Sequence, residues 1–196
     1  ETLNNLKKKF IRLKKNDIKS VKELLDAFGV YYIEAIGEAD ELCARLVIKK
    51  YAYACLSEDM DLFLYGCPRV LRYLSLTNES VIVYNLSLIL KDLDLTFKEF
   101  KEICVVAGTD YNTNTNLTLF KTLECFKKYK MLDLDIDFYT WLENEKYIDN
   151  IFNLYNAYNM FEPTKTKLPR LNNLTKNIQL PKIKKIMEPE GFIFLD

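Results

Sequence analysis

The spacing of hydrophobic residues in the first part of the chain is typical of a helix up to Gly29 and of a strand directly after it. Apolar side chains recur every three or four positions from residue 4 onward, and this run stops at Gly29, which predicts an amphipathic helix with a glycine end. Residues 30–36 and 51–57 are short apolar runs that predict strands, and residues 37–50 between them have helical spacing. Helix, strand, helix and strand in this order predict parallel pairing with crossover helices.

The pattern changes from strand to helix further along the chain. Residues 69–76 and 80–86 predict two strands joined by a turn, and residues 87–108 predict two short helices. Helical spacing then continues to Phe161. Residues 162–192 contain four prolines, many Asn and Thr residues and little periodicity, which predicts a linker or an extended arm. The whole pattern is typical of an α/β core followed by a helical region.

Composition limits the class of protein. The 196 residues include 49% apolar residues, enough for a substantial core, while 28 Lys and Arg residues balance 28 Asp and Glu residues. Overall charge therefore predicts affinity for neither nucleic acid nor membrane. No apolar run reaches the roughly 18 residues of a membrane span, so no membrane partner is expected.

Cysteine and histidine usage narrows the chemistry. Five widely spaced cysteines, with no CxxC pair, favour reduced core thiols and an intracellular, reducing compartment. The chain has no histidine, which excludes histidine bases and histidine-rich zinc sites. Any metal is therefore expected to be a hard cation held by oxygen.

Acidic residues interrupt the apolar pattern at two predicted strand ends. Asp59 and Asp61 follow the strand 51–57, and Glu38 and Asp40 follow the strand before it. Open α/β sheets bind ligands at the carboxyl ends of their strands, and a shared cation would remove the repulsion between these carboxylates. For each pair alone the alternative remains open that the acids stabilise the dipole of the next helix.

Three stretches in a fixed order resemble one family. "EAIGEADELCARLV", "ACLSEDMDLFLYGCPRVLRYL" and "ICVVAGTDYN" are similar to the internal nuclease region of the flap endonuclease family, which includes the xeroderma pigmentosum group G nuclease. The resemblance covers roughly residues 1 to 130. It implies a PIN-like nuclease core with a mostly parallel sheet flanked by helices over residues 1–110, a helix-turn-helix-like duplex-binding region over 111–162 and an extended basic tail over 163–196.

The resemblance also implies a function. It implies a Mg²⁺-dependent, structure-specific DNA endonuclease and 5′ exonuclease that cuts 5′ flaps in replication and repair, with two Mg²⁺ ions that Mn²⁺ can replace. The implied metal ligands and catalytic residues are Glu38, Asp40, Asp59, Asp61 and Asp110. From the pattern alone, Asp110 would be read as the N-cap of a following helix. Glu34 and Glu58 fall outside the implied ligand set.

The chain departs from the family pattern in two places. Nothing in it corresponds to the family's amino-terminal segment, so we expect a separate segment to complete the sheet and the metal site. The turn after Asp110 lacks the family's glycines, and Asn114 and Asn116 are the residues that can replace them in turn geometry, so a monovalent cation there is in doubt. Two alternatives therefore stay open: a catalytically incompetent DNA-binding or scaffold subunit, and an RNA-directed nuclease.

Partners and compartment follow from the same resemblance. The expected partner is DNA with a junction between duplex and single strand, in the nucleus or another compartment that contains DNA. A sliding clamp stays an open question, because no clear clamp-binding tail is present. Candidate phosphate contacts are three basic groups: residues 7–15, Lys121 to Lys130, and Lys165 to Lys185. Tyr111, Tyr129 and Trp141 are candidates for stacking on bases, with core packing favoured for each.

Overall fold

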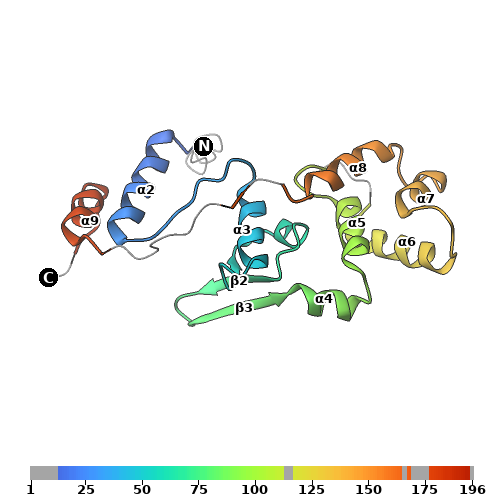
Figure 1. Cartoon of the computed structure of the whole chain (residues 1–196), viewed down its shortest axis with the longest axis horizontal. Coiled ribbons are helices and arrows are strands. Elements are labelled where there is room, and N and C mark those ends of the chain that lie inside the picture. Colours follow the sequence, from blue (N-terminus) through green and yellow to red (C-terminus); the bar gives the residue numbers. More distant parts are fainter. Residues whose placement is uncertain (1–12, 113–116, 165–166, 169–176, 195–196) are drawn as a thin grey trace, which may run out of the picture. The chain divides into compact units, whose positions relative to one another are not determined.

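The chain forms two compact units. The first unit combines residues 1–34 with residues 169–196, and the second comprises residues 35–168 (Figure 1). The predicted functional boundaries at residues 110 and 162 both fall inside the second unit. The structure is a computed structural model that describes residues 13–112, 117–164, 167–168 and 177–194. Across these residues, no helix has the length and the apolar content needed to cross a lipid bilayer.

The first unit contains a pair of helices. Helix α2 (Lys15–Phe28) ends at Gly29, whose φ of 73° is the left-handed conformation that glycine adopts without strain. Helix α9 (Leu180–Met187) continues into a short 3₁₀ helix, η2 (Glu188–Glu190). The backbone N–H just before α9 donates a 2.8 Å hydrogen bond to the carbonyl oxygen of Ala27, and Ala27 and Ile183 are buried. The predicted glycine stop of α2 is confirmed.

Two expectations for this part of the chain differ from the structure. Residues 30–36 do not form a strand, because the described residues supply no neighbouring strand to bond with them, and Ile36 is 96% exposed. Residues 162–192 were expected to be an extended arm, but α9 lies within them. Pro181 in its first turn is compatible with a helix start, and the apolar positions of α9 bury Ile183.

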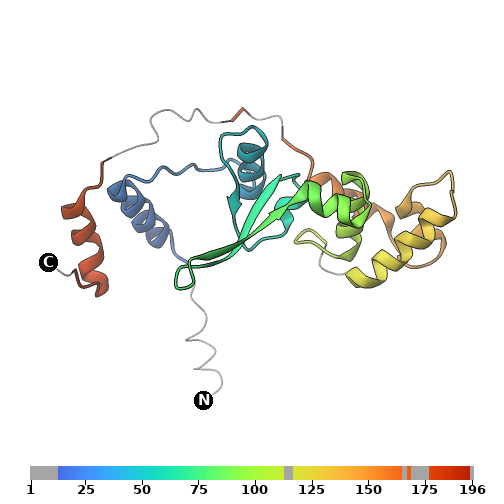
Figure 2. The ribbon, with the colours of Figure 1, turned by 90° about the horizontal axis from the view of Figure 1, so that it is seen from below.

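A mixed three-stranded sheet forms one part of the second unit. Strand β1 (Cys55–Leu56) pairs in parallel with β2 (Arg69–Ser75), and β2 pairs antiparallel with β3 (Ser80–Asn85). The order is β1-β2-β3 (Figure 2). The hairpin is therefore confirmed, whereas the parallel pair joins β1 to β2 and not to residues 30–36 as expected. Strand β1 is shorter than the apolar run 51–57, and Leu56 is 54% exposed, because the described residues provide β1 with a neighbour on one side alone.

Helices make up the rest of the second unit, and those predicted from the spacing are confirmed. Their bounds are α3 (Ala39–Ile48), η1 (Asp61–Phe63), α4 (Leu86–Leu93), α5 (Phe97–Ala107), α6 (Leu119–Met131), α7 (Phe138–Asn144) and α8 (Ile151–Met160). Local signals explain several starts. Thr96 and Glu99 form a reciprocal capping box at the start of α5, and Thr118 caps α6. Figure 1 shows α5, α6, α7 and α8 grouped together beyond α4.

The second unit has two hydrophobic clusters joined at one place. One cluster lies between α3 and the sheet and includes Leu62 and Phe63, while the other lies among α5 to α8 and includes Leu64. Tyr65 and Phe100 pack against both clusters. The short segment that begins at η1 therefore ties the sheet to the helical part. Trp141 is 4% exposed, which confirms its expected place in the core.

The start of α7 depends on one carboxylate. Asp137 accepts hydrogen bonds from the backbone N–H groups of Tyr139 and Thr140, at 3.1 and 3.2 Å, and from the hydroxyls of Thr140 and Tyr155, at 2.7 and 2.9 Å. Replacement Asp137→Ala removes this cap and should lower the free energy of unfolding by about 1 to 2 kcal/mol in urea unfolding at neutral pH. A variant as stable as the wild-type chain would contradict this role.

The same carboxylate predicts a pH dependence. Burial alone would raise the pKa of Asp137, but the hydrogen bonds from Thr140, Tyr155 and Tyr139 outweigh burial and hold the pKa below its ordinary value. The stabilisation is therefore present above the pKa of the unfolded chain and is lost as the pH falls through the lower pKa of the folded chain. We expect the stability difference between wild type and Asp137→Ala to shrink on acidification, and a constant difference would contradict the assignment.

Candidate active site

Two candidate acids lie at the start of α3. Glu38 occupies the N-cap position, but its side chain makes no capping hydrogen bond, and Asp40 lies in the first turn. Glu38 is exposed and Asp40 is half-buried. The absent side-chain cap weighs against a purely local role for Glu38. The helix itself buries Glu41, Ala44 and Val47.

Two more acids follow β1 in a tightly bonded turn. The backbone N–H of Asp59 donates to the hydroxyl of Ser57 at 3.1 Å, and Oδ1 of Asp59 accepts from the N–H of Asp61 at 2.8 Å. Asp61 is the first residue of η1, and Leu62 and Phe63 behind it are buried. The packing of these two buried residues holds the turn in place, while Asp59 and Asp61 stay half-exposed. The sequence Asp-x-Asp therefore has a defined geometry.

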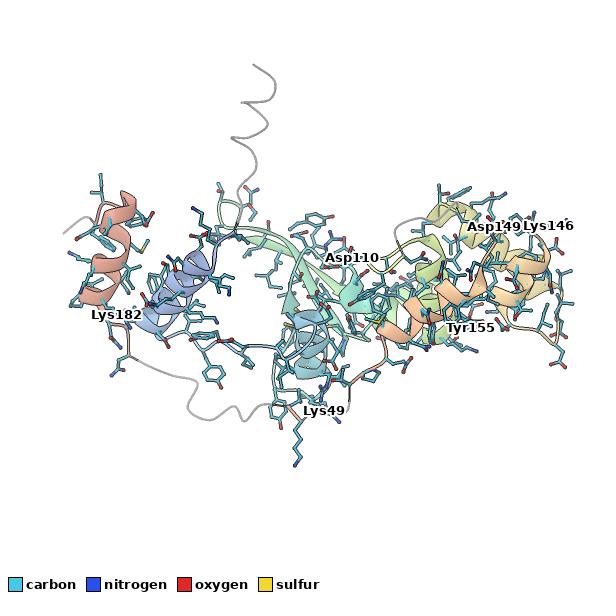
Figure 3. All side chains as sticks on the ribbon, turned by 90° about the horizontal axis from the view of Figure 1, so that it is seen from above. Lys49, Asp110, Lys146, Asp149, Tyr155 and Lys182 are labelled. Carbon is cyan, nitrogen blue, oxygen red and sulfur yellow. The ribbon has the colours of Figure 1, made fainter. Side chains whose placement is uncertain are left out.

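Asp110 lies in a short turn between α5 and α6 (Figure 3). The N–H of Asn112 donates to the carbonyl oxygen of Thr109 at 2.9 Å, and the side-chain amide of Asn112 donates to the carbonyl oxygen of Val105 at 2.7 Å. Helix α6 begins only at Leu119. Asp110 is therefore not the N-cap of the next helix, which removes the alternative that the sequence pattern favoured for it.

The acids from these three elements influence one another electrostatically. Burial raises the pKa of Asp40 above its ordinary value. The charges of Asp59, Glu38 and Asp110 raise it further. Burial and the charge of Asp59 also raise the pKa of Asp61 to about 6, although a hydrogen bond from the backbone of Asp110 lowers it. Negative charge thus accumulates where α3, the loop after β1 and the loop after α5 approach each other.

The carboxylate oxygens of these acids are suitable ligands for a hard divalent cation, but the acids are not grouped closely enough to form a metal site by themselves. Carboxylate oxygens are the ligands that Mg²⁺ prefers, and a bound cation would lower the raised pKa values of Asp40 and Asp61. Next to Asp110 in the chain, Oγ1 of Thr109 is buried and has no hydrogen-bond partner among the described residues. Among the described residues, no three Cys, Asp or Glu side chains are grouped closely enough to hold a metal ion. The metal and catalytic roles of the five acids stay predictions.

Residues outside the predicted set also shape the site. Glu58 accepts a hydrogen bond from the backbone N–H of Tyr73 at 2.7 Å and from Nε of Arg72 at 3.3 Å, so it ties the acidic loop to β2. Glu34 forms an ion pair with Lys22 at 2.6 Å in the first unit. Both acids thus have structural partners. Glu41 is 7% exposed. The sequence pattern did not indicate this burial, because an acid next to Asp40 in the first turn of a helix is typically exposed.

Comparison with known proteins places these elements in a family. The XPG I-region family model matches residues 29–110. Flap endonuclease 1 of Methanococcus aeolicus is 30% identical over 199 residues, which cover 95% of this chain and 60% of that protein. Flap endonuclease 1 of Drosophila mojavensis is 33% identical over 153 residues, covering 74% and 38%. The chain belongs to the flap endonuclease/XPG family.

Solved structures agree with this fold. The catalytic core of Rad2 superimposes with a TM-score of 0.76 at 23% identity, covering 89% of this chain and 68% of that one. The flap endonuclease-1 of Methanococcus jannaschii gives a TM-score of 0.73 at 22% identity, covering 97% and 58%. The matched I-region runs from Gly29 to Asp110 and so includes all five candidate acids. The chain spans about 60% of the length of the Methanococcus aeolicus relative.

Removing one acid of this cluster should stabilise the metal-free protein. Because the pKa of Asp61 is raised to about 6 in the folded chain, the folded state binds more protons than the unfolded state between pH 4 and 6, and stability falls as the pH rises through this window. In EDTA at about pH 7.5, Asp61→Asn should raise the free energy of unfolding by about 1 kcal/mol, after discounting for partial exposure.

The matched control is Asp92→Asn, which neutralises an exposed carboxylate of α4 in the same unit. It should leave urea unfolding unchanged. The advantage of Asp61→Asn should also vanish near pH 4, where the wild-type carboxyl is protonated in the folded chain. A clear loss of stability of Asp61→Asn in EDTA would show instead that the ionised carboxylate is a structural hydrogen-bond acceptor.

Proposed function

We propose that this chain forms part of a structure-specific DNA nuclease that hydrolyses phosphodiester bonds at 5′ flaps or related junctions with the help of Mg²⁺. The observation that carries the proposal is the electrostatic contact of Asp40 with Asp59 and Asp110, three acids from three separate elements within the matched XPG I-region. Burial and these neighbouring charges raise the pKa of Asp40, so an ionised Asp40 is costly for folding, and a shared cation removes that cost.

The residues that would hold the metal are Glu38, Asp40, Asp59, Asp61 and Asp110. When bound, divalent cations supply Lewis-acid activation of water and phosphate for in-line hydrolysis. The chain contributes placement: the backbone bonds of the turn after β1 fix Asp59 and Asp61, and the turn after α5 fixes Asp110. A chain without histidine can support this chemistry, because carboxylates alone provide the ligands and the negative field.

Substrate contact is proposed for the helical part of the same unit. Helix α6 carries Lys121, Lys127, Lys128 and Lys130, and positive charge on a helix near an acidic site favours contact with the phosphate backbone. Lys121 and Lys130 already form ion pairs with Glu124 and Glu99. Asn114 and Asn116, the proposed replacements for the family's turn glycines, lie outside the described residues. Rad2 and human GEN1, which have similar folds, are known in complexes with DNA.

The sheet offers a place for a further segment. Strand β1 has no partner on its outer edge among the described residues, and unpaired strand edges favour pairing with another strand. We propose that a separate amino-terminal segment pairs here and adds ligands to the metal site. This segment would also explain why the described acids do not by themselves form a three-ligand group.

A second candidate function is junction binding without cleavage. The lack of a three-ligand group among the described residues favours this scaffold role over catalysis by the chain alone. Binding and cleavage separate the two candidates, because a scaffold retains affinity for a junction in EDTA and shows no Mg²⁺-dependent product.

The test is cleavage of an end-labelled duplex with a 5′ flap. We expect Mg²⁺-dependent cleavage that Asp59→Asn lowers by at least about a hundredfold, because a lost ligand removes several kcal/mol of transition-state stabilisation. The matched control is Glu58→Gln, the neighbouring acid outside the ligand set, which keeps an acceptor for the N–H of Tyr73 and should stay within a few-fold of wild type.

Four outcomes would change the assignment. Cleavage that persists in EDTA, or equal losses in Asp59→Asn and Glu58→Gln, would contradict a metal-carboxylate nuclease. Tight binding of the flap without cleavage would support the scaffold. Preferential cleavage of an all-RNA competitor of the same structure would move the substrate class from DNA to RNA.

A further inference from the structure

The segment Phe161–Thr164, called the strap below, follows α8 and returns to the sheet side of the second unit. Phe161 is 1% exposed, and its ring packs edge-on against the rings of Tyr65 and Tyr111, with centroid distances of 5.1 and 5.2 Å. The hydroxyls of Tyr65 and Tyr111 share a hydrogen bond of 3.1 Å. The strap therefore closes an aromatic triangle between the segment after η1 and the turn after α5.

The middle of the strap is held by a buried lysine. Nζ of Lys101 on α5 lies 2.7 Å from Oε1 of Glu162 and 4.0 Å from the ring centroid of Tyr158 on α8. Lys101 is 2% exposed, so the carboxylate of Glu162 and the ring of Tyr158 take the place of water around its ammonium group. A buried ammonium group with two specific partners fixes the position of the strap relative to α5.

The end of the strap is clamped to α3. Oε1 of Glu41 accepts hydrogen bonds from the N–H and the hydroxyl of Thr164, both at 3.0 Å. Nη1 of Arg45 lies 3.3 Å from the same oxygen and donates to the hydroxyl of Thr164 at 3.1 Å. Because Glu41 is 7% exposed, removing its carboxylate would leave a donor of the strap and the guanidinium of Arg45 without this acceptor.

Three of the residues that the strap contacts lie beside a candidate ligand in the chain or one helical turn from it. Glu41 follows Asp40 directly, and Tyr111 follows Asp110 directly. Tyr65 lies one helical turn after Asp61. Phe161 and Thr164, at the two ends of the strap, thus touch sequence neighbours of acids from three elements that no hydrogen-bonded strand joins to one another. Because Phe161 is also a member of the helical hydrophobic cluster, a shift of the strap would change the spacing of these acids and the packing of that cluster together.

We infer that the strap Phe161–Thr164 is a positioning element that sets the spacing of the carboxylate site, with Glu41 as its anchor on α3. Insofar as it concerns metal binding, this inference rests on the proposed function. The strap also gives the helical part a mechanical connection to the acids, because it continues directly from α8. Movement of α8 on binding a duplex would therefore be transmitted to α3 and to the turn at Asp110.

The test compares Glu41→Ala with two matched variants of the 196-residue chain. Glu41→Gln keeps an oxygen that accepts from Thr164 and should restore most of the wild-type behaviour. Asp137→Ala removes a comparably bonded carboxylate at the cap of α7, away from the strap contacts, and controls for general loss of stability. Hydrogen exchange in EDTA reports on the amides of α3 and on the N–H of Asn112 in the Asp110 turn.

Faster exchange at both α3 and the Asp110 turn in Glu41→Ala, with neither change in Asp137→Ala, is the expected result. Titration with Mn²⁺ as the probe should then give about tenfold weaker binding for Glu41→Ala than for wild type, as found for residues that position metal ligands, and near wild-type binding for Glu41→Gln. Loss of binding without loss of the fold separates positioning from simple destabilisation.

Exchange that changes in α3 alone, or equally in Asp137→Ala, would overturn the inference, as would Mn²⁺ affinity that is unchanged in Glu41→Ala. The failure of the proposed function looks different. If the wild-type chain binds no Mn²⁺ while Glu41→Ala still speeds exchange at both places, the strap stands as a positioning element and the metal site fails.

Discussion

Repulsion between like charges is the constraint around which the second unit is organised. Asp40, Asp59 and Asp110 come from three elements, and burial together with the charges of Asp59 and Asp110 raises the pKa of Asp40. A folded chain tolerates this only when the surrounding contacts are strong enough to hold the elements together. The buried residues beneath Asp61, the bonded turn around Asn112 and the clamp at Glu41 are the contacts that do so.

These contacts also explain how two hydrophobic clusters act as one unit. Leu62 and Phe63 face one cluster and Leu64 faces the other, so the chain crosses between them just after Asp61. Phe161 closes the same junction from the far end of the helical part. Asp61 therefore lies where the sheet and the helices meet, which is a usual position for a ligand site. The XPG I-region match covers the same residues.

Local signals in the sequence were sufficient for much of the fold. The glycine after α2, the Thr96 and Glu99 capping box of α5 and the apolar spacing of the hairpin strands act within a few residues, so the spacing predicted these elements. Residues 30–36 have an equally strand-like pattern, but among the described residues no neighbouring strand bonds to them. Strand formation depends on such a partner, which the spacing of apolar residues cannot reveal.

The candidate site divides in the same way. Asp59 and Asp61 were visible as acids at a strand end, whereas the pattern alone favoured a helix cap for Asp110 and only the family resemblance implied a ligand role. The structure places the start of α6 at Leu119, so Asp110 is not its cap. The contact between Glu41 and Thr164 joins residues 123 positions apart, and no local pattern reports such a pairing. We infer that long-range polar contacts of this kind set the spacing of the acids, so the candidate acids could be predicted from the sequence and their geometry could not.

The most direct test of the account is the location of a divalent cation in crystals of the chain grown or soaked with Mn²⁺. Anomalous scattering identifies the ion independently of any activity. The account predicts a peak bounded by the carboxylates of α3, of the loop after β1 and of Asp110. Peaks confined to other surfaces, or carboxylates that turn away from one another in the presence of the ion, would contradict it.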